Sequence, residues 1–139
     1  MIPFYAQDHD YSGFNVLAVD DVPLNLLLVQ KMLSRFNFKM RTAANGQLAL
    51  DAVAEQKPDL ILLDLMMPGI DGFEVIRRLR ANPDTADIQI VILSALNSNE
   101  DVVKGFNVGA NDFIMKPIIM EKLLSCVITQ LQIAAAKAK

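Results

Sequence analysis

The chain has 139 residues, of which 53% are hydrophobic and 21% are charged, and its formal net charge is −3. This composition predicts one compact globular domain and argues against intrinsic disorder. The small acidic excess argues against a surface that neutralises nucleic-acid phosphates, so we expect no direct binding of nucleic acid.

Targeting and redox signals are few. Residues 1–13 lack a basic start followed by a long apolar run, so we predict no signal peptide. No apolar stretch approaches the roughly 18 to 20 residues that cross a bilayer, so we expect no membrane association. The single cysteine, Cys126, cannot form an intrachain disulfide, which makes a reducing cytoplasm the expected location. Its apolar helical surroundings favour a packed side chain over a reactive thiol.

Short apolar runs alternate with longer amphipathic runs. In chain order, they predict a strand at 14–19, a helix at 23–36, a strand at 38–43, a helix at 48–55, a strand at 60–63, a helix through Phe73, Ile76 and Leu79, a strand at 88–93, a helix through Val102 and Phe106, a strand at 113–115 and a helix from Met120 to Leu131. Asn82-Pro83 and Gly109 are typical of residues that end the third and fourth helices.

This alternation predicts an α/β fold of the (βα)5 type. Short connections between each strand and the next helix predict a parallel sheet, since parallel pairing needs a crossover between strands. Such crossovers are right-handed almost without exception. Continuous apolar strands are typical of a sheet covered by helices on both faces, so we predict a doubly wound three-layer sandwich. We divide the chain into an N-terminal leader (1–13), one domain (14–133) and a helix-prone C-terminal tail (134–139).

Five polar residues follow the ends of four predicted strands. They are Asp20, Asp21, Asp64, Ser94 and Lys116. The carboxyl ends of parallel strands line the crevice where ligands bind, so these side chains are predicted to meet at one rim of the sheet. A single polar residue after a strand is uninformative, because strands commonly end by meeting solvent. Five residues of these chemical types together indicate a site.

The three aspartates predict a metal site. Converging carboxylates repel one another unless a cation joins them, and oxygen ligands completed by water and phosphate are typical of Mg²⁺, with Mn²⁺ as the alternative. An aspartate beside such a cation can attack phosphorus, while Lys116 and Ser94 can bind the phosphoryl oxygens. The sequence has no cluster of His and Cys that indicates zinc, and His9 is interpreted as solvated.

Four segments resemble the signature of bacterial response-regulator receiver domains. They are VDD (19–21), LLDLMMPGIDG (62–72), LSA (93–95) and GANDFIMKP (109–117), and the resemblance covers about residues 14–133. It implies a flavodoxin-like fold with strand order 2-1-3-4-5. It also implies a protein that accepts a phosphoryl group from a sensor histidine kinase or a histidine phosphotransfer protein, and that assists its own phosphorylation and dephosphorylation without being a turnover enzyme.

The resemblance assigns roles to the site. It implies that Asp64 is the phosphoacceptor, that Asp21 binds Mg²⁺ directly, and that Asp20 binds it directly or through water. The backbone carbonyl of Met66 would complete the protein ligands. The resemblance favours a cis Lys116-Pro117 bond, whereas the base rate for bonds before proline favours trans.

The resemblance also implies a switch. Ser94 and Lys116 would contact the phosphoryl group, and Phe113 would be an aromatic switch residue that turns inward; an ordinary buried strand aromatic is the alternative. The fourth helix, last strand and fifth helix would form the output surface, for an unidentified partner or for a homodimer. Only two charges lie between 118 and 133, so we expect apolar surface on the outer face of the last helix, a packed terminal segment being the alternative.

The expected lifetime of the phosphoryl group depends on two apolar residues. Met66 and Leu96 lie two positions beyond Asp64 and Ser94, where they flank the phosphoryl site in the family. Neither side chain can orient an attacking water. We therefore predict slow self-dephosphorylation.

Two other classes of protein also use such a sheet. A haloacid-dehalogenase-like Mg²⁺-dependent phosphatase would need its nucleophile after the first strand and a second acid two residues later, whereas Asp20 is followed by Asp21 and Val22. A flavodoxin-like FMN carrier would need a phosphate loop rich in Ser, Thr and Gly, whereas DDVPLN (20–25) places carboxylates there. Both alternatives fit less well than a receiver domain.

Overall fold

Five strands alternate with five helices in a computed structural model that describes residues 10–96 and 98–137. In chain order these elements are β1 (Asn15–Val19), α1 (Pro23–Met32), β2 (Lys39–Ala43), α2 (Gly46–Glu55), β3 (Leu60–Leu63), α3 (Gly72–Ala81), β4 (Gln89–Ser94), α4 (Asn99–Val108), β5 (Asp112–Met115) and α5 (Met120–Lys137). All strand pairs are parallel, and the order across the sheet is β2-β1-β3-β4-β5. The predicted doubly wound (βα)5 fold is confirmed.

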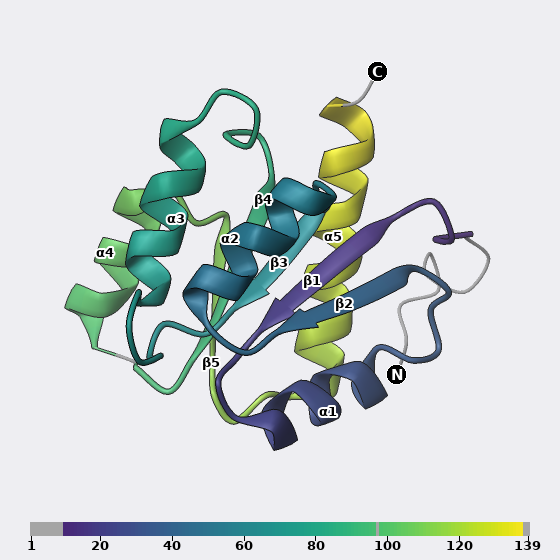
Figure 1. Ribbon diagram of the computed structural model, residues 1–139. Helices are drawn as coiled ribbons and strands as arrows, with labels where there is room; N and C mark the ends of the chain where they lie inside the picture. Colours follow the sequence, from purple (N-terminus) through teal and green to yellow (C-terminus); the bar gives the residue numbers. More distant parts are fainter. Residues whose placement is uncertain (1–9, 97, 138–139) are drawn as a thin grey trace.

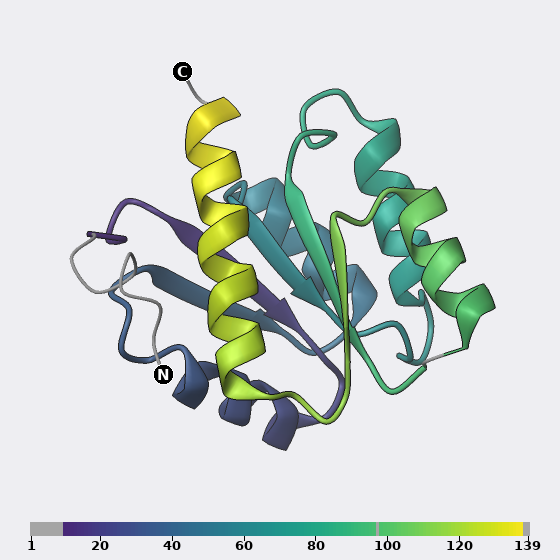
Figure 2. The ribbon, with the colours of Figure 1, turned by 180° about the vertical axis from the view of Figure 1, so that it is seen from behind.

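The helices cover both faces of the sheet and form three layers. Helices α2, α3 and α4 lie on one face, and α1 and α5 lie on the other (Figures 1 and 2). Alternate residues of β1 therefore enter different cores: Val16 and Ala18 pack toward α1 and α5, while Leu17 and Val19 pack toward α2 and α3. Burial on both faces explains why the central strands consist of uninterrupted apolar residues.

Side chains at the loop ends fix where several helices begin. The side chains of Asn45, Asp71 and Ser98 accept hydrogen bonds from backbone N–H groups in the first turns of α2, α3 and α4, as capping residues do. Gly109 ends α4 with a φ of 121°, a conformation that favours glycine. These residues set where α2, α3 and α4 begin and where α4 ends.

Helix α1 is shorter than predicted. It ends at Met32 instead of continuing to Phe36, because Phe36 turns to pack edge-on against Tyr11 at 5.5 Å and stacks on Phe38 at 6.0 Å. Tyr11 is buried in the core although it falls in the predicted leader. Residues 1–9 of that leader and 138–139 of the predicted tail lie outside the described residues, and the predicted domain limits of 14–133 stay a prediction.

Helix α5 is longer than the predicted apolar pattern, since it continues to Lys137. Lys137 Nζ donates to Gln89 Oε1 at 2.6 Å, and the buried Gln89 amide in turn donates to Gln130 Oε1. This polar contact joins the last turns of α5 to the start of β4. A contact between elements so distant in sequence could not be read from the alanine-rich tail.

Exposed apolar side chains occur on several elements, among them the α4-β5-α5 side and α1. Most of the apolar residues of α5 are buried against the sheet. The prediction of an extended apolar surface on the outer face of this helix is therefore wrong. The exposed apolar residues of the α4, β5 and α5 side are Val103, Phe106, Met115, Ile119, Met120 and Ile133. Helix α1, for which no such surface was predicted, exposes Leu24, Leu27 and Leu28. In the described part of the chain, every helix is too short or too polar to traverse a bilayer.

Candidate functional site

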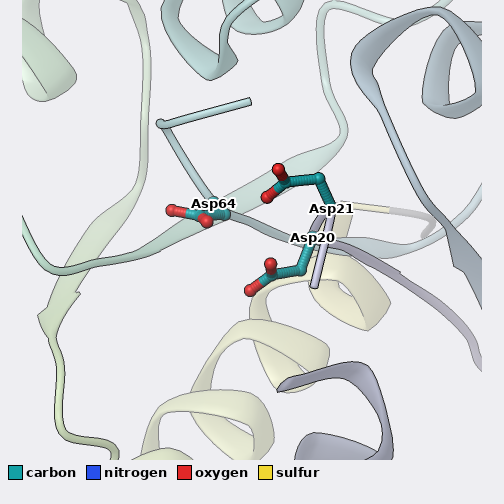
Figure 3. Close-up of side chains that lie close together, drawn as sticks. All are labelled: Asp20, Asp21 and Asp64. Carbon is teal, nitrogen blue, oxygen red and sulfur yellow. The ribbon is translucent and has the colours of Figure 1, made fainter. Parts of the chain in front are cut away.

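The predicted site residues meet at the carboxyl ends of the strands. Asp20 and Asp21 directly follow β1, Asp64 follows β3, Ser94 is the last residue of β4, and Lys116 follows β5. Since β1 and β3 are neighbours, their ends bring the aspartates together, and one carboxylate oxygen from each of Asp20, Asp21 and Asp64 lies within 4.8 Å of the others. Figure 3 shows these three side chains at the adjoining strand ends.

Lys116 supplies the positive charge at this rim. Its Nζ lies 3.0 Å from Asp20 Oδ2 and 3.6 Å from Asp64 Oδ2. It reaches them from β5, two strands away from β3, and the Lys116-Pro117 peptide bond that follows is cis. The family resemblance therefore gave the correct isomer and the base rate did not.

Three donors hold the buried carboxylate of Asp20. The backbone N–H of Val22 donates to Oδ1 at 2.9 Å, while Asn25 Nδ2 and Lys116 Nζ both donate to Oδ2, at 3.1 and 3.0 Å. The sequence reasoning missed Asn25. Its place five residues after Asp20, in a helix that starts at the rim, put it near the site but did not predict the direction of its side chain.

Asp64 is also buried, and its carboxylate accepts a long hydrogen bond of 3.4 Å from the backbone N–H of Met66. Burial raises the pKa of Asp64 above its ordinary value, and the nearby Asp20 carboxylate adds to this, while the Lys116 ammonium opposes it. An ionised Asp64 is therefore held at a cost in the folded protein. A cation at the rim would remove that cost.

The raised pKa of Asp64 predicts a pH-dependent stability difference. The folded state binds the Asp64 proton more tightly than the unfolded state. The contribution of Asp64 to the free energy of unfolding therefore falls as the pH rises from 3.8 through the raised pKa. We expect Asp64→Asn to have a higher free energy of unfolding than wild type at neutral pH without divalent cations, and less advantage in acid. Urea unfolding at both pH values measures this. An Asp64→Asn variant that is less stable than wild type at neutral pH would contradict the raised pKa of Asp64.

The loop after β3 is shaped by close backbone packing. The N–H of Gly72 donates to the carbonyl of Leu65 at 3.0 Å. A Cβ at Gly72 would lie 2.5 Å from the carbonyl oxygen of Asp64. A side chain at Gly72 would therefore clash with the backbone of this loop, and Gly69 nearby has a φ of 80°. The start of α3 thus rests directly on the backbone of Asp64.

The two predicted switch residues lie on the neighbouring strands. Ser94 is fully buried, and its Oγ accepts a hydrogen bond of 3.1 Å from the N–H of Leu96. Phe113 on β5 is half-buried beneath α4, where a Cβ at Gly105 would lie 3.2 Å from its ring. Met66 is exposed beside Asp64. Ser94 thus lies at the end of β4, and Phe113 lies on the adjacent strand β5, where it packs against α4.

The acidic cluster fits a hard divalent cation. Its donors are carboxylate oxygens, and its three carboxylates outnumber the single ammonium of Lys116. Oxygen donors with an excess of negative charge suit Mg²⁺. His9, interpreted as solvated, lies outside the described residues. Cys126 is buried, and burial with the nearby Asp112 carboxylate raises the pKa of its thiol to about 12, as expected for an unreactive packed residue.

Comparisons with known proteins identify the family. Residues 16–128 match the model of the response regulator receiver domain. The chain is 43% identical over 103 residues to response regulator PleD of Caulobacter vibrioides, a match that covers 74% of this chain and 23% of PleD. It is 41% identical over 104 residues to transcriptional regulatory protein AfsQ1 of Streptomyces coelicolor, covering 75% and 45%. The chain spans less than half the length of these relatives.

A solved structure agrees with the sequence matches. The receiver domain of a signal transduction histidine kinase from Syntrophus aciditrophicus superimposes with a TM-score of 0.80 at 32% identity, over 86% of this chain and 91% of that domain. These matches do not support the haloacid-dehalogenase alternative. With a matching family model over most of its length, the expected fold, and acidic residues gathered at the expected rim, this chain belongs to the response regulator receiver domain family.

Proposed function

We propose that this receiver domain accepts a phosphoryl group on Asp64 from a phosphohistidine of a sensor histidine kinase or a histidine phosphotransfer protein. One observation carries the proposal: Asp64 lies in a cluster with Asp20 and Asp21, and its carboxylate is 3.6 Å from the ammonium of Lys116. A nucleophile, cation ligands and a counter-charge for phosphoryl oxygens are thus together at one rim.

In the proposed transfer, an Asp64 carboxylate oxygen forms a bond to phosphorus as the phosphorus–nitrogen bond of the phosphohistidine breaks. The imidazole nitrogen keeps the electron pair of that bond. Lys116 neutralises charge on the phosphoryl oxygens. Asp20, Asp21 and the backbone carbonyl of Met66 would hold Mg²⁺ or Mn²⁺, which supplies further neutralisation when bound. The domain assists this reaction on itself and does not turn over a substrate.

The added charge, about −1.5 to −2 for a phosphoryl group at neutral pH, would be read through Ser94 and Phe113. Ser94 would turn toward the phosphoryl oxygens, and Phe113, which is already half-buried beneath α4, would become more deeply buried. The α4-β5-α5 side, with its exposed Val103, Phe106 and Met115, then offers an apolar surface for a homodimer or for a separate output partner. We place the protein in the cytoplasm, where such kinases present their phosphohistidines.

Acetyl phosphate labelling tests the proposal. With Mg²⁺, wild type is expected to gain one acid-stable, hydroxylamine-sensitive phosphoryl group, and Asp64→Asn is expected to gain none because the nucleophile is missing. Gel filtration before and after labelling reports whether the α4-β5-α5 side forms a dimer. Labelling of Asp64→Asn at the wild-type level would contradict Asp64 as the acceptor.

The lifetime of the phosphoryl group provides a second test. Met66 is exposed two residues after Asp64, and Leu96 is half-buried two residues after Ser94. Both side chains are apolar, so neither can form a hydrogen bond that orients an attacking water. We expect Met66→Asn and Leu96→Glu each to speed the decay of phosphorylated protein by about tenfold, which is less than the roughly hundredfold or larger effect of a fully positioned acid or base. Loss of radiolabel measures the decay. Unchanged rates in both variants would dispose of this explanation.

A further inference from the structure

Asn25 lies in the first half of α1, where its side chain reaches back to the acidic rim. Its Nδ2 donates to Asp20 Oδ2 at 3.1 Å, and Lys116 Nζ donates to the same oxygen at 3.0 Å. The other carboxylate oxygen accepts the N–H of Val22. Since Asp20 is only 6% exposed, these protein donors fix the orientation of its carboxylate.

Lys116 is shared between two carboxylates, whereas Asn25 is not. The ammonium of Lys116 lies between Asp20 and Asp64, at 3.0 and 3.6 Å. A phosphoryl group on Asp64 would draw Lys116 toward its oxygens and away from Asp20. A buried carboxylate oxygen that loses a charged donor is destabilised unless another donor remains. Asn25 is the side-chain donor that stays.

We propose that Asn25 is a positioning residue that keeps the Asp20 carboxylate turned toward the cation while Lys116 changes partners. This rests on the proposed function, because it takes Asp20 as a cation ligand. The side-chain amide suits this role because it donates a hydrogen bond but carries no charge. Asn25 therefore orients the carboxylate without the repulsion that Lys116 exerts on a bound cation. Donors behind a metal ligand commonly set its orientation and strengthen metal binding.

Mg²⁺ binding to the unphosphorylated protein, measured by titration calorimetry with Mg²⁺ alone, tests this role. Asn25→Leu keeps a similar volume but removes the donor, and it is expected to weaken Mg²⁺ binding by about tenfold. Asn25→Ala, which removes the donor without adding bulk at the rim, is expected to give the same loss. Gln30→Leu, which removes an exposed amide from the same helix, is the matched control and is expected to bind Mg²⁺ like wild type.

A double-mutant cycle with Lys116→Met separates positioning from a general structural effect. In the Asn25→Leu single variant, Lys116 still donates a hydrogen bond to Asp20 Oδ2. In the double variant with Lys116→Met, neither side chain donates to this oxygen. The loss caused by Asn25→Leu is therefore expected to be at least about threefold larger in the Lys116→Met background. Thermal unfolding in EDTA reports separately on the fold of each variant.

Additive effects in the cycle would overturn the positioning role, as would Asn25→Leu and Asn25→Ala proteins that bind Mg²⁺ like wild type. In either case wild type still binds Mg²⁺, and the proposed function stands. If wild type itself fails to bind Mg²⁺ at millimolar concentrations, the proposed metal site and the role of Asn25 fail together. The two kinds of failure are thus distinguishable.

Discussion

Replacing Lys116 with methionine is expected to slow phosphoryl transfer to Asp64 by about a hundredfold or more, the usual effect of losing one group that stabilises transition-state charge. The same change should tighten Mg²⁺ binding, because the ammonium now 3.0 Å from Asp20 no longer competes with the cation. Labelling rates with acetyl phosphate and calorimetric titration with Mg²⁺ measure the two effects. Their opposite directions distinguish a loss of catalytic charge from simple damage to the rim.

Lys122→Met is the matched control for this experiment. Lys122 is an exposed lysine on α5, and its loss changes the net charge of the protein by the same amount. We expect labelling and Mg²⁺ binding close to those of wild type. Slow labelling of Lys122→Met, or weaker Mg²⁺ binding by Lys116→Met, would refute the local role of the Lys116 ammonium.

Gly72→Ala is expected to lower the free energy of unfolding by about 2 to 3 kcal/mol, at the upper end of the usual cost of overpacking. The added Cβ would lie 2.5 Å from the Asp64 carbonyl oxygen and 2.8 Å from the Leu65 Cα. Both atoms belong to the backbone, so relief requires α3 or the phosphoacceptor loop to move. Urea unfolding measures the loss, and slower labelling of Asp64 should accompany it.

Gly13→Ala gives the opposite expectation for the same chemical change. Apart from the adjacent residues of the chain, no described residue has an atom within 4 Å of a Cβ built at Gly13, so alanine there restricts the unfolded chain without a clash and should leave stability unchanged or slightly higher. If Gly72→Ala proved as stable as Gly13→Ala, the close approach of α3 to Asp64 would not constrain the loop.

The sequence predicted the central features of the fold because they follow from local patterns. Strand β3 occupies 60–63 as expected, since an uninterrupted apolar run between Asp59 and Asp64 suits a strand buried on both faces. The site residues were predictable for a related reason. In a parallel sheet, polar residues that end different strands must share one rim, so Asp20, Asp64 and Lys116 met as expected.

The features that were missed depend on contacts between distant segments. The helical pattern of α1 continues to Phe36, but the ring of Tyr11 offers a packing partner that ends the helix earlier. The alanine-rich end of α5 stays helical through Lys137, which bonds to Gln89 on β4. Asn25 was missed because its contact with Asp20 depends on the direction in which α1 leaves the rim. No local pattern encodes such directions.

Lys116 follows the last strand in the sequence, which is also an edge strand of the sheet, so its charge is synthesised after the acids that it contacts. Chains emerge from the ribosome N-terminus first, at about 5 to 20 residues per second, so β1 and β3 are available to pair before β5 exists. In an intermediate in which β1 and β3 have paired but β5 has not yet joined β4, the carboxylates of Asp20 and Asp64 would lie close together without the ammonium that lies beside both in the folded protein. Addition of this edge strand would then complete the sheet and bring the positive charge to the acidic rim in the same step.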